Sequence, residues 1–143
     1  MRALIILALF TPAAFADATS CPAAVKTAID KAFPKATISR CKAEKEHGRD
    51  QFEVKAAKAD GKAIEVDVTP DGKILQVEEK IAIDQVPAAV KKAFEARYPK
   101  AKLDGAEKQT PASGAPTYEL AFATDAGRKE ATFTEDGKFV EEE

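Results

Sequence analysis

Apolar residues recur with the period of an α-helix in two stretches of the chain, residues 21–36 and 86–101. They lie three and four positions apart, which gives each predicted helix one apolar face. These residues are Val25, Ala28, Ile29, Ala32 and Phe33 in the first stretch and Val90, Ala93, Phe94 and Tyr98 in the second. Pro22 and Pro87 stand at the first helical position, where proline is tolerated. Pro34 and Pro99 end the two helices, because the residue before a proline is disfavoured in a helix.

After each predicted helix the period changes to two, which predicts β-strands. The alternating apolar residues are Phe52, Val54 and Ala56, then Ile64, Val66 and Val68, and later Tyr118, Leu120 and Phe122. Asp71-Gly72 and Asp136-Gly137 are the dipeptide of a type I′ hairpin, whose two central residues need positive φ. The residues that a two-residue turn sets opposite each other are Val68 and Leu75, Val66 and Val77, and Phe133 and Val140.

The two halves of the chain are copies of one module. At a shift of 65 positions, residues 21–36 match residues 86–101 with nine identities in sixteen, and residues 65–75 match residues 130–140 with five in eleven. We predict an α+β fold of tandem helix-plus-antiparallel-sheet modules (α-β4 twice), with the helices covering one face of the sheet. The two modules would share one sheet or one interface. The predicted segments are a signal peptide in residues 1–16, a first module in residues 17–83 and a second module in residues 84–143.

The first sixteen residues have the parts of a secretory signal peptide. Arg2 gives a positive start, residues 3–10 form an apolar run, and residues 14–16 fit the small-x-small cleavage pattern. The run is too short to span a membrane, and no later stretch approaches the roughly 18 apolar residues of a spanning helix. We expect a protein of the periplasm or a secreted protein, with no membrane association after cleavage.

Cys21 and Cys41 predict one disulfide, because paired cysteines in an exported chain are usually oxidised. A helix of about twelve residues rises roughly 18 Å and a strand of about six residues returns by a similar distance, which brings Cys41 level with Cys21. Ile38 and Cys41 have opposite parity, so a strand that turns both toward the helix needs a bulge. The alternative is a lipid on Cys21, although the preceding residues lack the apolar position of a lipidation signal.

The charge pattern argues against a nucleic-acid partner. The chain has 22 basic and 24 acidic residues, and removal of residues 1–16 takes away Arg2 and leaves 21 against 24, a net charge of −3. Lysine and glutamate are interspersed along most of the chain, and no basic stripe is present. We expect no nucleic-acid binding.

The sequence carries no recognisable catalytic motif. Gly-x-Ser-x-Gly, His-Glu-x-x-His and glycine-rich phosphate loops are all absent. The single histidine, His47, lies in a polar loop, where a solvated side chain is the usual case. We predict a protein that is not an enzyme and that uses no cofactor.

Residues 67–78 have the spacing of an EF-hand calcium loop, with Asp67, Asp71 and Glu78 at its first, fifth and twelfth positions. An EF-hand needs a helix on each side, whereas the flanking residues alternate as strands. We interpret the stretch as a hairpin whose carboxylates point to alternating faces and form no metal site. Calcium should therefore bind there no more tightly than about 10 μM.

The order of the elements resembles a known family. Each copy has a helix ending at "FP" or "YP", then "FEV" or "YEL", then an alternating strand and "DGK" before a last strand. This order is similar to the PepSY-like family, in particular its β-lactamase-inhibitor-like branch. The resemblance covers nearly all of residues 17–143, and the second copy matches more closely. It implies an exported α-β4 module, often in tandem. Some relatives are inhibitory, including domains of peptidase propeptides, and the family offers no catalytic residues to carry over.

The sheet face that points away from the helices is the candidate site. The predicted partner-binding residues on it are Glu53, Glu65, Asp67, Ile74, Glu119, Glu130 and Phe139. With Glu141, this face has six carboxylates against one lysine, Lys55, and Ile74 and Phe139 are equivalent apolar residues beside the two turns. We expect an acidic surface with two apolar anchors that selects a partner with a basic rim. An ordinary solvated face would also explain the acidic residues.

Two functions remain open at this point. The first is an exported non-catalytic binding module with an unknown protein partner, inhibitory toward an envelope or secreted protein such as a peptidase. The second is a structural or sensory envelope protein that binds a cation or small ligand through its acidic face. A stoichiometric protein partner would favour the first, and a metal-dependent shift in melting temperature would favour the second.

Overall fold

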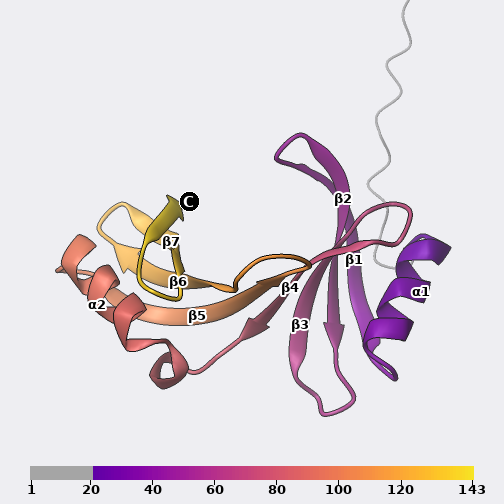
Figure 1. Ribbon diagram of the computed structural model, residues 1–143, viewed down its shortest axis with the longest axis horizontal. Coiled ribbons are helices and arrows are strands. Elements are labelled where there is room, and N and C mark those ends of the chain that lie inside the picture. Colours follow the sequence, from indigo (N-terminus) through magenta and orange to yellow (C-terminus); the bar gives the residue numbers. More distant parts are fainter. Residues whose placement is uncertain (1–20) are drawn as a thin grey trace, which may run out of the picture.

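The structure is a computed structural model that describes residues 21–143, so the signal peptide predicted for residues 1–16 lies outside the described residues (Figure 1). The elements in chain order are α1 (Ala23–Ala32), β1 (Thr37–Glu46), β2 (Arg49–Ala57), β3 (Ala63–Val68), β4 (Ile74–Lys80), the 3-10 helix η1 (Ile83–Gln85), α2 (Ala88–Arg97), β5 (Lys102–Pro111), β6 (Thr117–Thr124), β7 (Gly127–Thr134) and β8 (Phe139–Glu142). The predicted α+β fold, with one helix and four antiparallel strands in each copy, is confirmed.

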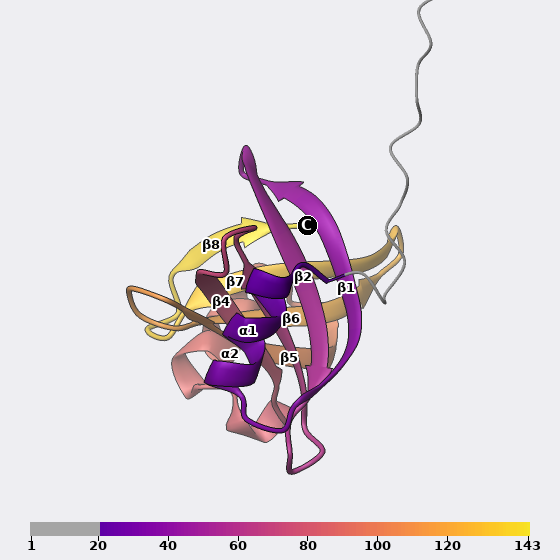
Figure 2. The same ribbon diagram turned by 90° about the vertical axis from the view of Figure 1, so that its right-hand side faces the viewer.

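The two modules share one continuous sheet of eight strands in the order β1 to β8. The junction is the antiparallel pairing of β4 with β5, which runs from Gln76 opposite Pro111 to Lys80 opposite Glu107. The sheet is curved, and α1 and α2 lie on its outer side at opposite ends of the molecule (Figure 1 and Figure 2). Within residues 21–143, no helix lies on the inner, concave side.

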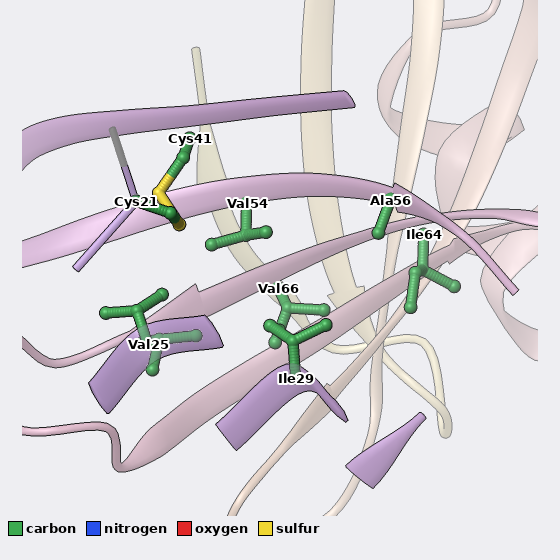
Figure 3. Packing of buried hydrophobic residues seen from close by; sticks show 9 residues of the cluster. Cys21, Val25, Ile29, Cys41, Val54, Ala56, Ile64 and Val66 are labelled. Carbon is green, nitrogen blue, oxygen red and sulfur yellow. A yellow bond between two sulfur atoms is a disulfide. The ribbon is translucent and has the colours of Figure 1, made fainter. Parts of the chain in front are cut away.

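The first core forms where α1 packs on β1 to β4 (Figure 3). Val25 and Ile29 of α1 are fully buried, and Val54 and Val66 meet them from the sheet. These valines lie on one face because side chains alternate along a strand. The helical stripe and the strand alternation read from the sequence therefore form a single apolar layer.

The predicted disulfide is present and lies at one end of this core. Cys21 and Cys41 are bonded, with their Cα atoms 5.4 Å apart, and both residues are buried. β1 has the bulge that the pairing requires, because its register with β2 shifts between Ile38 and Arg40. Ile38 and Cys41 consequently both pack on the helix side.

The second core is aromatic. Phe94 of α2, Phe122 of β6 and Phe133 of β7 are all buried. The rings of Phe94 and Phe122 meet edge to face with centroids 5.1 Å apart, and Tyr98 adds a third ring 4.5 Å from Phe122. Edge-to-face contacts of this kind add to the stability that the buried area gives.

The two Asp-Gly turns are not type I′ turns. Gly72 has φ of 90°, but Asp71 does not have positive φ, and the turn closes with a bond from the Thr69 N–H to the Lys73 carbonyl. The loop therefore has three residues. In the first copy, proline at position 70 favours a type I turn, and a glycine with positive φ completes it. The Thr134 N–H makes the same bond to Lys138 in the second copy.

The three-residue loop changes which residues face the core. Val68 lies opposite Ile74, and Phe133 lies opposite Phe139, so the predicted pairs of Val68 with Leu75 and of Phe133 with Val140 are wrong. A register shift follows in each hairpin, and it restores the predicted pairing of Val66 with Val77. Ile74 and Phe139 consequently pack against the two cores. Their predicted place on the open face is therefore corrected.

Candidate functional site

The concave face of the sheet holds a groove of about 550 Å³, called here the acidic groove. All eight strands contribute to it, because in each strand the residues of one parity point away from the helices. Its eleven carboxylates are Glu44, Glu46, Glu53, Glu65, Asp67, Glu78, Glu107, Glu119, Glu130, Glu141 and Glu143. Arg49 and Lys55 are the basic residues among the described residues that line it, so the groove is strongly acidic.

The groove extends between two raised parts of the molecule. The β1–β2 hairpin stands on one side and the C-terminal end of the chain on the other (Figure 1). Glu46 and His47 line the groove from the hairpin, and Glu141 and Glu143 line it from the C-terminal end. Carboxylates therefore occupy both walls as well as the floor.

Five residues predicted for partner binding line the acidic groove. They are Glu53, Glu65, Asp67, Glu119 and Glu130. Ile74 and Phe139 do not, because the three-residue turns direct them to the cores, and the guanidinium of Arg97 lies 3.6 Å from the ring centre of Phe139. The two apolar anchors expected on this face are thus absent from it, whereas a partner-binding role for the carboxylates stays a prediction.

Other carboxylates of the groove were missed. Glu44 and Glu46 come from β1 and Glu107 from β5, two strands with too few apolar residues to show clear alternation. The bulges in both strands also break the period of two. The sequence did offer one signal: Glu44 and Glu46 have the parity opposite to Cys41, which places both glutamates on the face away from the helix.

Glutamine amides link the carboxylates across the junction of the two modules. Gln109 of β5 donates from Nε2 to Glu78 of β4, at 3.3 Å, and to Glu119 of β6, at 3.0 Å. Its Oε1 accepts a bond from the Thr117 hydroxyl at 2.9 Å. Gln76 also donates to Glu78, at 2.8 Å. The centre of the groove is therefore held together by neutral donors that come from both modules.

Lys55 already has partners on the side of β2 and β3. Its Nζ lies 2.7 Å from Glu65 and 4.0 Å from Glu53. The bond with Glu65 raises the pKa of Lys55, so the ammonium stays charged. This lysine neutralises charge at one end of the groove and does not pair with the central carboxylates.

The central carboxylates have raised pKa values. Burial is the main cause for Asp67, whose pKa rises to about 7 with a further contribution from Glu78. Burial likewise raises the pKa of Glu119 to about 8, and the charge of Glu130 adds to it. The pKa values of Glu78 and Glu107 are raised by burial as well. Burial and mutual repulsion both disfavour the charged form of a carboxyl.

The stretch with EF-hand spacing forms the predicted hairpin of β3 and β4. Its carboxylates do not simply alternate between faces, since Asp67 and Glu78 both line the acidic groove. Asp71 lies apart from them in the turn, where it accepts a bond from the Thr69 hydroxyl that lowers its pKa. Weak calcium binding by this stretch stays a prediction.

Residues 21–143 contain no group of three or more His, Cys, Asp or Glu residues placed to hold a metal ion. His47, in the turn between β1 and β2, lines the groove with a largely exposed ring 3.8 Å from Glu46. In this same part of the chain no helix is long and apolar enough to cross a membrane.

Comparison with known proteins agrees with the fold. The family described as "Putative beta-lactamase-inhibitor-like, PepSY-like" matches residues 13–76 and residues 53–141. No curated protein matches the chain.

Three solved structures from Bacteroides species share the fold. One described as "putative periplasmic proteins" from Bacteroides eggerthii is 19% identical with a TM-score of 0.69, covering 87% of this chain and 88% of its own. A DUF2874 family protein from Bacteroides uniformis is 16% identical with a TM-score of 0.70, covering 87% and 89%. A BLIP-like protein from Bacteroides fragilis is 21% identical with a TM-score of 0.64, covering 87% and 86%. At such identities the likeness shows the fold alone.

Proposed function

The chain belongs to the PepSY-like, β-lactamase-inhibitor-like family, and we propose that it is an exported, non-catalytic binding module that takes a basic surface of a protein partner into the acidic groove. The partner would be a protein of the cell envelope or a secreted protein. Two points support the proposal: the distribution of charge over the sheet and the polar lining of the groove.

Segregation of charge is the observation that carries the proposal. The whole chain is nearly balanced, with 22 basic and 24 acidic residues. The groove, in contrast, is lined within residues 21–143 by eleven carboxylates and two basic residues. Like charges gathered on one face repel one another and destabilise the compact state. A partner with lysine or arginine side chains would relieve this repulsion, and complementary charge gives such a contact its selectivity.

The lining of the groove favours a protein partner over a small ligand. Small-molecule pockets are mostly apolar, with a few polar groups that fix orientation. Leu75 is the one large apolar residue among the described residues that line this groove. The groove, which is lined by Glu46 and His47 from the β1–β2 hairpin and by Glu141 and Glu143 from the C-terminal end, also suits a loop that carries several basic side chains.

An exported, inhibitory role is consistent with the relatives and with the disulfide. The family is described as β-lactamase-inhibitor-like, and one structure with this fold is described as BLIP-like. Another is described as periplasmic, and disulfides such as Cys21–Cys41 persist in oxidising compartments. Where the partner is an enzyme, for example a peptidase, a complex that covers basic residues beside its active site would inhibit it.

Affinity capture from an envelope extract, followed by titration of the purified partner, tests the proposal. The groove variant E78Q/E107Q/E119Q removes three carboxyl groups from the groove, and D30N/E95Q/D125N removes three exposed carboxyl groups elsewhere. We expect the groove variant to bind the partner at least about tenfold more weakly, a loss of about 1.4 kcal/mol, and the control variant to bind like the wild type.

Salt and calcium provide the remaining controls. Binding of the wild type should weaken as salt rises, because added ions screen exposed charges. A captured protein that binds both variants equally well would refute the proposal. Stabilisation of the free chain by micromolar calcium without any protein partner would instead support the second function, a cation-binding envelope protein.

A further inference from the structure

Besides Glu65, which is paired with Lys55, the four strands at the centre of the sheet each place one half-buried carboxylate in the acidic groove. These are Asp67 of β3, Glu78 of β4, Glu107 of β5 and Glu119 of β6. Two belong to the first module and two to the second. The centre of the groove therefore exists because β4 and β5 join the modules into one sheet.

These four carboxylates have few basic neighbours. Within residues 21–143, no lysine or arginine nitrogen lies within 4.0 Å of Asp67, Glu78 or Glu119. Lys80 reaches Glu107 only at 4.0 Å, and its own side chain is 76% exposed. Glu78 and Glu119 accept bonds from glutamine amides, which are neutral.

The groups that face the central carboxylates are mostly acidic on every neighbouring strand. Around Asp67, β1 presents Glu44 and Glu46, β2 presents Glu53 and Lys55, and β4 presents Glu78. Around Glu119, β5 presents Glu107, β7 presents Glu130, and Glu141 and Glu143 lie at the C-terminal end. Arg49 and His47 lie at the β1–β2 hairpin, and Lys55 is bonded to Glu65.

Burial, together with repulsion between neighbouring carboxylates, lets these carboxyl groups keep protons at neutral pH. The pKa of Asp67 is raised to about 7 and that of Glu119 to about 8, in each case chiefly by burial. Near pH 7 the free groove therefore holds protons that an ordinary surface carboxylate has already lost.

Building on the proposed function, we propose that the acidic groove takes up its basic partner in exchange for protons, so that affinity rises between pH 6 and pH 8. Guanidinium or ammonium groups of the partner replace the protons on Asp67 and Glu119. The displaced protons pass to the solvent, and no other reactant is needed.

The direction of the pH dependence follows from linkage. A bound cation favours the charged carboxylate and so lowers its pKa, which makes the bound state hold fewer protons than the free state. Affinity then increases with pH for as long as the free groove is still protonated, and it levels off above the free pKa of about 8 for Glu119. Release of one proton corresponds to a tenfold rise in affinity per pH unit in this window.

Isothermal titration calorimetry with acetyl-hexa-arginine-amide tests the inference. Arginine stays charged at every pH used, so the probe itself does not titrate. Titrations at pH 6, 7, 8 and 9 and constant ionic strength give the affinity. Two buffers of different ionisation enthalpy at each pH give the number of protons released. We expect at least a tenfold rise in affinity from pH 6 to pH 8, with about one proton released.

Variants show which residues release the protons on binding. D67N/E119Q should bind with an affinity that changes less than threefold over the same range, whereas D30N/E95Q, which removes the same kinds of charge from the helices, should behave like the wild type. H47Q is a further control, because His47 also lines the groove, and this variant should keep most of the pH dependence. Equal proton release by D67N/E119Q and the wild type would overturn the assignment.

The outcomes distinguish this inference from the proposed function. Binding of hexa-arginine with constant affinity and no proton release would overturn the exchange and leave the basic partner intact as a proposal. No binding of hexa-arginine at any pH up to millimolar concentration would overturn both. Because proton release is measured on the wild type, the test does not depend on the folding of any variant.

Discussion

The two modules reach the same α-β4 fold with different cores. In the first, a disulfide ties the segment before α1 to β1, and mostly aliphatic side chains fill the space between helix and sheet. In the second, Val86 and Ala106 stand at the cysteine positions, and aromatic rings fill that space. The equivalent positions that gain an aromatic ring are Ile29 and Phe94, Ala56 and Phe122, Val68 and Phe133, and Ile74 and Phe139.

This difference indicates that more than one kind of interaction can fix the helix to the sheet in this fold. A disulfide acts mainly by restricting the unfolded chain, whereas aromatic rings stabilise the folded chain through buried area. The concave face differs less between the modules. Glu53 and Glu119 are equivalent residues, as are Glu65 and Glu130, and all four line the acidic groove.

The largest expected effect is the loss of an aromatic ring from the second core. Phe122 is fully buried against Phe94 and Tyr98, so Phe122→Ala should lower the free energy of unfolding by about 4 kcal/mol. Urea denaturation followed by circular dichroism measures the change. V140A, at an exposed residue of the same module, serves as the control. A loss below about 1 kcal/mol would mean that the aromatic rings do not hold this module together.

Removal of the disulfide should have the next largest effect. C21A/C41A should lower the free energy of unfolding by about 3 kcal/mol, because the bond closes a loop with a sequence separation of 20 residues. Dithiothreitol should destabilise the wild type by a similar amount and leave the double variant unchanged. If the reductant has no effect on the wild type, the comparison between a cross-linked and an aromatic module fails.

A smaller loss is expected at the two positions that the turns direct to the cores. Ile74→Ser and Phe139→Ser should each lower the free energy of unfolding by about 2 kcal/mol, since both side chains are partly buried against a core. Val140→Ser should be nearly neutral, because that residue is exposed. The reverse order of Phe139 and Val140 would show that the second turn has two residues and not three.

The smallest expected effect concerns the protonation of Asp67. Its pKa in the folded chain is raised to about 7, so its contribution to stability is fully present below the unfolded pKa of about 4, falls as pH rises toward 7 and is lost above 7. Asp67→Asn should therefore raise the free energy of unfolding by about 1 kcal/mol at pH 8.5 and leave it unchanged at pH 4. Melting temperatures of both proteins at these two pH values test the prediction, and E95Q is the control. A gain of equal size at both pH values would exclude titration as its cause.

The sequence predicted the architecture well because its local periodicity and its internal repeat agree. The helical stripes, the alternating strands and the 65-residue repeat all lead to α-β4 twice, and each appears in the structure. The disulfide and the bulge beside it were also predictable, since Ile38 and Cys41 cannot both face the helix from a regular strand. Continuity of the sheet was left open, because pairing between β4 and β5 involves mostly polar residues.

The candidate site was predicted only in part, and the reason lies in the turns. An Asp-Gly dipeptide is compatible with a two-residue or a three-residue loop, and the choice reverses the parity of the next residue. Ile74 and Phe139 were misplaced for this reason, whereas Glu65 and Asp67, which precede the turn, were placed correctly. The depth of the groove comes from the curvature of the sheet, which no local pattern in the sequence specifies.

Mapping of hexa-arginine by nuclear magnetic resonance is the sharpest test of whether a basic partner binds the concave face. Backbone amide shifts of the ¹⁵N-labelled chain, recorded during titration at pH 8, report where the peptide binds. We predict that shift changes concentrate on the groove residues of β3 to β6, including Asp67, Glu78 and Glu119, and that α1 and α2 stay unchanged. Shift changes confined to the helices, or spread evenly over the surface, would contradict the account.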